Sequence, residues 1–201
     1  MGSMKIYFTA SMHGKTQFGA NYQAVVKALK DNGHTVYSDH IMKWSLEEMK
    51  TWGDKENLAY HRKVLEDIKK AECVFVETSY SSASVGYMIA FAVQMSKPVI
   101  IFYSGSAEPF LFRTLENTNE KLQVIRYNTL DELRNEIPAA LAFASASMDT
   151  RFNFFVSPDQ VDYLDWVAEN RKISRSVYLR NLINAELEHA DPEFWDELEK
   201  G

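Results

Sequence analysis

The sequence has one cysteine and no long apolar run. The single cysteine, Cys73, excludes a disulfide bond within the chain, and its place in an apolar stretch indicates a buried small side chain rather than a nucleophile. No apolar run approaches the roughly 20 residues that cross a bilayer, so we expect no membrane partner. Histidine, cysteine, aspartate and glutamate nowhere cluster with the spacing of metal ligands, so we expect neither a metal nor another cofactor. A cytoplasmic protein is the simplest interpretation.

Positive charge is also scarce. The chain has 22 Lys and Arg residues against 28 Asp and Glu, and the net charge of -6 argues against nucleic acid as the main partner of the whole chain. Apolar residues make up 46% of the sequence and charged residues 25%, which is typical of a globular protein. With 201 residues the chain can form one good core, or one core with a small appendage.

The rest of the chain is organised around residues 72–103, ECVFVETSYSSASVGYMIAFAVQMSKPVIIFY. Two short apolar runs, at 73–76 and 99–103, have the length of buried strands. Between them, residues 84–95 are apolar on all sides, as in a helix packed against a sheet, and Lys97-Pro98 ends that helix. This stretch predicts a strand, a serine-rich loop, a helix and a second strand, which together form a βαβ unit.

The same alternation of strand and helix extends over residues 4–144. Five strands joined by helices predict an α/β fold, with a flavodoxin- or Rossmann-like five-stranded parallel sheet covered on both faces. Residues 41–58 are harder to interpret, and we expect a short helix or a lid there. In the longer helix that follows, Leu58, Leu65 and Ile68 are expected to face inward. The expected strands are 5–9, 35–37, 73–76, 99–103 and 122–127, and the expected helices are 17–32, 55–71, 84–95, 109–118 and 129–143.

The loop at 78–84, TSYSSAS, indicates a site for an anion. It carries several hydroxyl groups where the first turn of the next helix leaves backbone N–H groups without partners, and such a helix start attracts anions. In an open parallel sheet the ligand crevice lies at the carboxyl ends of the strands. A flavodoxin-like strand order would bring the loop at 10–16 beside this one. We expect ligand-binding residues at Tyr7, Ser11, His13, Gly14, Ser82, Ser84 and Gly86, with His13 and Lys15 as candidate counter-charges.

The sequence changes character after about residue 144. Residues 145–150 are small and polar, as in a linker, and RFNFFV at 151–156 predicts a strand. Ser157-Pro158-Asp159-Gln160 has the pattern of a helix start. Because one strand and two short helices cannot close a core alone, we expect residues 151–190 to pair with a second copy, followed by an acidic tail at 191–201. The residues expected to face inward are Val161, Leu164 and Val167 in the first helix, and Val177, Leu182, Ile183 and Leu187 in the second.

FNFFVSPDQVDYLDWVAENRKISRSVYLRNLI resembles a ribbon-helix-helix module, in which two chains pair their strands. The resemblance implies that Arg151 and Asn153 point from the strand into the DNA major groove, and that Ser174 and Arg175 contact phosphate. Phe155 departs from the pattern, because a polar residue is expected there. Charge departs as well, since residues 151–201 hold 6 Lys and Arg against 11 Asp and Glu, a balance of -5. We therefore favour a homodimer or higher homo-oligomer over DNA binding.

Three stretches of the first 143 residues carry a second resemblance: KIYFTAS at 5–11, YSDHI at 37–41 and KKAECVFVETSYSSASVGYMIAFAVQMSKPVIIF at 69–102. They resemble the deoxynucleoside 5′-monophosphate N-glycosidases, members of the nucleoside 2-deoxyribosyltransferase-like superfamily. In that family a glutamate after Gly-Tyr attacks or stabilises the anomeric carbon of deoxyribose, and an aspartate on the preceding helix assists. The resemblance implies a nucleoside monophosphate as ligand.

Both family carboxylates are missing at the matching positions. Met88 follows Gly86-Tyr87 in place of the glutamate, and Val64 stands in place of the helix aspartate. Cleavage of an N-glycosidic bond builds positive charge on the sugar, which neither a thioether nor an isopropyl group can neutralise. Glu77 or Asp39 could have taken over a carboxylate role, although residues at strand ends more often bond to backbone or water.

Three hypotheses follow from the sequence. The first is a dimeric nucleotide-binding homologue of the N-glycosidases that has lost catalysis and acts as a sensor or regulator. The second is an active N-glycosidase or deoxyribosyltransferase with relocated carboxylates. The third is a regulator that binds DNA through its C-terminal module. Release of free base from a deoxynucleotide discriminates the first from the second, and a gel shift tests the third.

Overall fold

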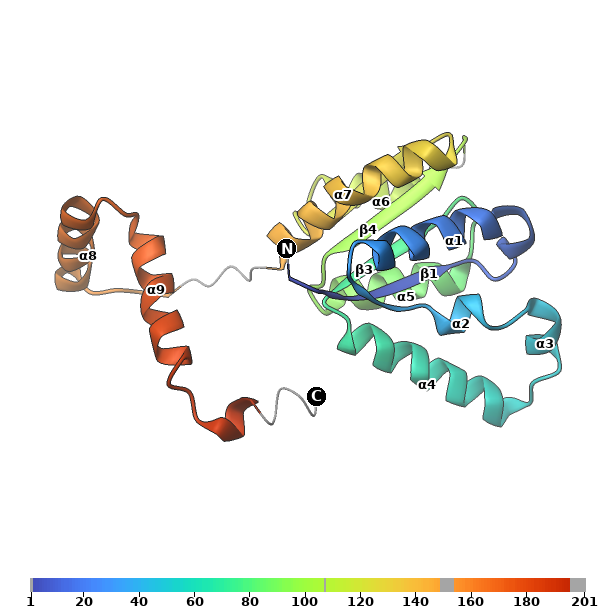
Figure 1. The fold of residues 1–201 in the computed structure, drawn as a ribbon, viewed down its shortest axis with the longest axis horizontal. Helices are drawn as coiled ribbons and strands as arrows, with labels where there is room; N and C mark the ends of the chain where they lie inside the picture. The colour runs from blue at the N-terminus through green and yellow to red at the C-terminus, as the bar shows by residue number, and fades with distance from the viewer. Residues whose placement is uncertain (1, 107, 149–153, 196–201) are drawn as a thin grey trace. The chain divides into compact units, whose positions relative to one another are not determined.

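A computed structural model describes residues 2–106, 108–148 and 154–195. The chain divides into two compact units, residues 1–150 and 151–201 (Figure 1). Within the part of the chain that the structure describes, none of the helices combines the length and the apolar character needed to cross a membrane.

The first unit is an α/β domain built on a parallel sheet. Its five strands lie in the order β2-β1-β3-β4-β5, which confirms the predicted flavodoxin-like arrangement and places β1 beside β3. The sheet is nearly all apolar, as expected for parallel strands covered on both faces. The strands are β1 (Lys5–Ala10), β2 (Thr35–Tyr37), β3 (Cys73–Glu77), β4 (Val99–Ser104) and β5 (Leu122–Tyr127).

Helices cover both faces of this sheet (Figure 1). On one face, α1 and α7 pack over Phe8, Phe75 and Phe102; on the other, α4 and α5 pack over Tyr7 and Val76. Consecutive residues of each strand therefore belong to different core layers. The helices are α1 (Lys15–Asp31), α2 (Asp39–Met42), α3 (Leu46–Lys50), α4 (Asp54–Lys70), α5 (Ala83–Gln94), α6 (Phe110–Glu116) and α7 (Leu130–Ser147).

Several local expectations need correction. Leu58 is 50% exposed, because the first turns of α4 extend beyond the core that covers Ile68. Residues 145–147, expected in the linker, form the last turn of α7. At the start of α7, which was expected at residue 129, the Thr129 side chain accepts from the Glu132 backbone N–H, and the Glu132 carboxylate accepts from the Asn128 backbone N–H. Cys73 is fully buried, and burial raises the pKa of its thiol to about 12.

The second unit contains α8 (Pro158–Arg171) and α9 (Arg175–Leu187). Ser157 and Gln160 form the predicted capping box at the start of α8. Among the described residues of this unit, the buried core consists of Leu164, Val167 and Tyr178. The expected strand is not formed in its described part, residues 154–156, because a single strand in one chain has no ladder partner. The inward positions expected on α9 are also wrong for a single copy: Val177, Leu182, Ile183 and Leu187 are between 39% and 67% exposed.

Candidate functional site

Met88 lies in a buried polar network between α5 and β1. Its sulfur accepts hydrogen bonds from the Tyr7 hydroxyl at 3.4 Å and from the Thr9 hydroxyl at 3.3 Å. The Nε2 atom of His40 lies 3.0 Å from both of these hydroxyl oxygens, and the His40 ring stacks on Tyr7 with centroids 4.8 Å apart. All four side chains are more than nine-tenths buried. A thioether therefore occupies a point where two buried hydroxyl groups converge, and such a point also suits a carboxylate.

The two hydrogen bonds to the Met88 sulfur imply one tautomer of His40. If both hydroxyl protons point at the sulfur, Nε2 must carry a proton and donate it to the hydroxyl oxygens. Nδ1 is then a bare acceptor, and within the described residues it has no hydrogen-bond partner. Burial of the ring, together with the positive charge of Lys63, lowers the pKa of His40 to about 3. The ring is therefore neutral at physiological pH and can act there only through hydrogen bonds.

A cavity of about 340 Å³ lies over this network, between α4 and α5. Met88 and Val64 both line it, so the structure brings together the two positions that match the family's carboxylates. The ring of Tyr87 stacks on that of His61 at its edge, with centroids 5.9 Å apart. None of the described residues that line the cavity carries a carboxylate; they are Tyr60, His61, Val64, Ala83, Ser84, Tyr87 and Met88.

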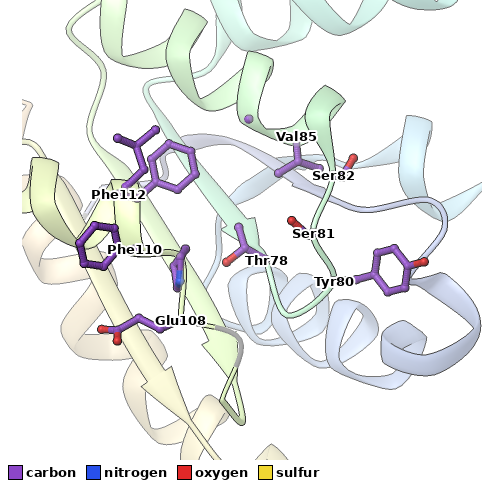
Figure 2. A pocket seen from close by; sticks show the side chains of 11 residues that line it. Thr78, Tyr80, Ser81, Ser82, Val85, Glu108, Phe110 and Phe112 are labelled. Atoms are coloured by element: carbon purple, nitrogen blue, oxygen red, sulfur yellow. The ribbon is translucent and has the colours of Figure 1, made fainter.

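A second cavity, of about 350 Å³, lies at the start of α5 (Figure 2). Figure 2 shows Ser81 and Ser82 on one side of it and Phe110 and Phe112 on the other. Ser82 is the N-cap residue of α5, yet its side chain makes no capping hydrogen bond. The backbone N–H groups at the helix start therefore do not donate to the Ser82 hydroxyl. Gly86 also lines this cavity, and a Cβ atom built on it would meet open space. We refer to this cavity, lined by residues 78–86 and 108–112, as the loop cavity.

The loop after β1 meets the loop after β3 at Tyr80. A Cβ atom on Gly14 would lie 2.5 Å from the Tyr80 Cβ and 2.6 Å from the Tyr22 hydroxyl, so only glycine fits there. Ser11 is buried, and its hydroxyl accepts from the Gly14 N–H at 3.4 Å. Ser82 and Gly86 line the loop cavity, whereas Ser11, His13 and Gly14 do not. The ring of Tyr80 points away from the cavity, toward the β1 side (Figure 2).

Lys15 is not a free counter-charge. Its ammonium group donates to the Met42 carbonyl at 3.1 Å and to the Trp44 carbonyl at 2.5 Å. Burial lowers the pKa of Lys15. Lys15 therefore holds the chain after α2 against the start of α1. This role of Lys15 could not be predicted from the sequence, because every residue has a backbone carbonyl and its position depends on the fold.

The two carboxylates considered as replacements do not reach Met88. Glu77 is fully buried but belongs to the sheet face of Phe75, whereas Met88 packs on the opposite face with Val76. Asp39 lies at the surface and pairs with Lys43 at 2.6 Å. The alternative with these two carboxylates as catalysts is therefore not supported by their positions.

Asp67 is a buried carboxylate that the sequence reasoning missed. It lies on α4, one helical turn after Val64, and it forms an ion pair with Lys63. Its side chain is 6% exposed. The spacing of three residues from Val64 could have indicated it. Because Lys63 already neutralises it, Asp67 does not present a free charge to the cavity over Met88.

The structure describes two of the four residues expected to contact DNA. Arg151 and Asn153 lie outside the described residues. The Ser174 hydroxyl caps α9 by accepting from the Val177 N–H at 3.2 Å, and Arg175 forms an ion pair with Asp165 of α8. Phe155 is fully exposed.

No family model matches the sequence. Curated relatives do match it. A protein of Syntrophotalea carbinolica with the provisional name 2′-deoxynucleoside 5′-phosphate N-hydrolase 1 is 30% identical over 130 residues, covering 65% of this chain and 89% of the relative. A protein of Danio rerio named 5-hydroxymethyl-dUMP N-hydrolase is 28% identical over 134 residues, covering 66% of this chain and 92% of the relative. Among solved structures, the CMP N-glycosidase BcmB of Clostridium botulinum has a TM-score of 0.50 at 16% identity, covering 67% of this chain and 98% of that one.

The match to the solved structure agrees with the α/β fold of the first unit. The α/β domain has the fold of the nucleoside 2-deoxyribosyltransferase-like superfamily. Within that superfamily, the chain belongs to the family of the 2′-deoxynucleoside 5′-phosphate N-hydrolases. The matched stretches span about two thirds of the chain and nearly all of each relative, so roughly a third of this chain has no counterpart in them.

Proposed function

We propose that the α/β domain binds a nucleoside monophosphate without cleaving its N-glycosidic bond, and that the protein acts as a dimeric sensor or regulator. The observation that carries this proposal is the pair of hydrogen bonds from Tyr7 and Thr9 to the Met88 sulfur. The two hydroxyl donors of the site are in place, but the sulfur that accepts their hydrogen bonds is uncharged.

The chemistry of glycosidic cleavage explains why this acceptor matters. As the bond to the base breaks, positive charge develops at the anomeric carbon, and a neighbouring carboxylate stabilises it or forms an ester with it. A thioether held by two hydroxyl donors has its lone pairs engaged and carries no charge. Val64, on the facing helix, offers only methyl groups to the same cavity. The site therefore favours binding over turnover.

The features suited to the phosphate end of a nucleotide are intact. The start of α5 presents backbone N–H groups that the Ser82 hydroxyl does not cap. Ser81 and Gly86 line the same loop cavity. Helix N-termini of this kind favour anions through both their N–H groups and the helix dipole. The aromatic residues Tyr60 and Tyr87 line the neighbouring cavity and offer surfaces to a base or sugar.

Base release measured on matched variants tests the loss of catalysis. Wild type, Met88→Glu, Met88→Gln and the double variant Val64→Asp/Met88→Glu are incubated with each common deoxynucleoside 5′-monophosphate, and free base is measured by chromatography. We expect no release by wild type or by Met88→Gln. We expect measurable release by Met88→Glu and more by the double variant, because the Tyr7 and Thr9 hydroxyls already point at the carboxylate position. Release of base by wild type would overturn the proposal in favour of an active N-hydrolase.

Calorimetry tests the binding half of the proposal. Titration of wild type with the same nucleotides should show binding at millimolar ligand or below, and the variant Gly86→Leu, whose side chain would enter the loop cavity, should bind less. No heat of binding with any nucleotide at millimolar concentration would contradict the proposal.

We also propose that the C-terminal unit pairs with a second copy. In residues 154–195 its buried core contains three side chains, which is too few for a unit of this size to be stable alone. An apolar groove of about 420 Å³ runs between residues 154–164 and α9, beside the exposed side chains of Leu182 and Ile183. A second copy offers the same apolar surface, so two copies can cover each other's groove. The acidic balance of this unit favours such pairing over contact with phosphates.

A further inference from the structure

A buried carboxyl group connects the two loops that form the loop cavity. It lies on the face of the sheet opposite to Met88. Glu77, the last residue of β3, is fully buried. Its Oε1 atom accepts hydrogen bonds from the Ser79 backbone N–H at 3.2 Å, from the Ser79 hydroxyl and from the Tyr127 hydroxyl at 2.8 Å. The Ser79 oxygen in turn accepts from the Ser104 backbone N–H at 2.8 Å. One carboxyl oxygen therefore fixes the chain where β3 ends and, through Ser79, where β4 ends.

The two segments fixed in this way lead directly into opposite walls of the loop cavity. The segment after β3 continues into Ser81 and Ser82, and the segment after β4 continues into Glu108 and Phe110 (Figure 2). No hydrogen bond of the described residues joins Ser81 or Ser82 to Glu108 or Phe110. The spacing of the walls therefore depends on the anchors at their bases. Two of these anchors are the hydrogen bonds from the Thr78 N–H and the Thr78 hydroxyl to the Phe102 carbonyl, at 2.8 and 3.1 Å, and Glu77 holds the others through Ser79.

We propose that Glu77 is a positioning residue of the loop cavity, and that it holds the two walls at the spacing needed for ligand binding only while its carboxyl group is protonated. This inference rests on the proposed nucleotide binding, and it adds a proton to the conditions for that binding.

The surroundings of Glu77 explain the need for the proton. Its Oε2 atom is buried and, within the described residues, lacks a hydrogen-bond partner. The titratable groups that face it are Tyr22 from α1 and Tyr127 from β5, and β4 contributes the uncharged Ser104. Burial raises the pKa of Glu77, although its hydrogen bonds with Ser79 and Tyr127 act in the opposite direction. A carboxylate here would be a buried charge without a facing cation, so the chain must open to admit water around it.

Binding measured against pH in matched variants tests this inference. Wild type, Glu77→Gln and Glu77→Leu are titrated with a deoxynucleoside 5′-monophosphate and with inorganic phosphate between about pH 5 and pH 8. Glutamine keeps an uncharged acceptor for Ser79 and Tyr127, whereas leucine removes it. Because the variants are compared at the same pH with the same ligand, the ratio of wild-type to Glu77→Gln Kd isolates the effect of the proton on Glu77.

We expect this ratio to be near one at the acid end and to rise about tenfold by the alkaline end, a change worth about 1.4 kcal/mol. Glu77→Leu should bind more weakly at every pH. A ratio that stays flat, or a Glu77→Leu variant that binds as wild type does, would overturn the inference. Hydrogen exchange of residues 78–86 and 108–112 without ligand gives a second readout: protection should fall with rising pH in wild type but not in Glu77→Gln. If wild type binds neither ligand at any pH, nucleotide binding fails, and the exchange measurement still decides the role of Glu77.

Discussion

The sulfur of Met88 on α5 lies 3.4 Å from the hydroxyl of Tyr7 on β1. The sulfur also accepts from Thr9, so Met88 offers an acceptor to both hydroxyls of β1. Met88, which the resemblance matches to the family's glutamate, is a buried residue of the core in this chain. Its contribution is to stability as well as to the shape of the site.

Replacing Met88 should therefore reveal its role as an acceptor. Met88→Leu keeps the apolar volume but removes the sulfur, which leaves the Tyr7 and Thr9 hydroxyls buried without that partner. We expect the free energy of unfolding to fall by about 1–3 kcal/mol, measured by urea denaturation. Met88→Gln supplies an oxygen at a similar distance and should lose less. Equal stability of Met88→Leu and wild type would show that the hydroxyls have other partners.

The buried neutral state of His40 predicts a pH dependence of stability. The folded-state pKa of about 3 lies below the ordinary value of 6.5, so the unfolded chain takes up a proton before the folded chain does. The contribution of His40 is therefore complete above about pH 6.5 and is lost as the pH falls toward 3. The full difference corresponds to roughly 5 kcal/mol. Urea denaturation at about pH 7 and pH 4.5 should show a larger loss for wild type than for His40→Asn, which cannot titrate. Parallel losses in the two proteins would contradict this account.

Glycine at position 14 is required by the contact between two loops. Gly14→Ala places a Cβ atom against Tyr80 and Tyr22, so one of these side chains must move, and we expect a loss of about 1–3 kcal/mol. Gly19→Ala is the matched control. It lies in α1, where the nearest atom would be the Lys15 side chain at 4.0 Å, and should be stabilising by up to about 1 kcal/mol. If both substitutions change the thermal midpoint in the same direction, the tight contact at Gly14 is not decisive.

Charge placed on the exposed apolar face of α9 should prevent pairing. Ile183 is 67% exposed, and Ile183→Glu would put a carboxylate into the proposed interface. We expect sedimentation analysis to give a dimer for wild type and a monomer for this variant. Asn184→Glu adds the same charge at the neighbouring exposed position and should remain dimeric. A wild-type monomer at high micromolar concentration would reject pairing through this unit.

The sheet could be predicted from sequence because each strand is a short apolar run bounded by polar turns. Its order followed from the resemblance to doubly wound folds, and the pairing of β1 with β3 confirms it. Leu58 was assigned wrongly because helical periodicity does not reveal where a helix runs past the core it covers. The exposure of the apolar positions on α9 has a related reason. A periodic apolar pattern indicates that a face is buried, but it does not say whether the same chain or a second copy buries it.

The candidate site was only partly accessible to sequence reasoning. The resemblance identified Met88 and Val64, and the structure places both on one cavity. The part played by Tyr7, Thr9 and His40 around the sulfur could not be read from sequence, because it depends on which face of β1 and which turn of α2 point inward. Glu77 was considered as a catalyst because it is a carboxylate at a strand end. The one-residue alternation of the strand places it on the opposite face, where it has a different role.

The burial of Cys73 has a practical consequence. Since the only native thiol is inaccessible and its pKa is raised to about 12, alkylating reagents should leave the wild-type chain unmodified. A cysteine introduced at an exposed position of α9 would then be the sole labelled residue. A spin label attached there would report separations between copies directly, and the same reagent applied to a cysteine beside Ser82 would follow nucleotide occupancy in the intact chain.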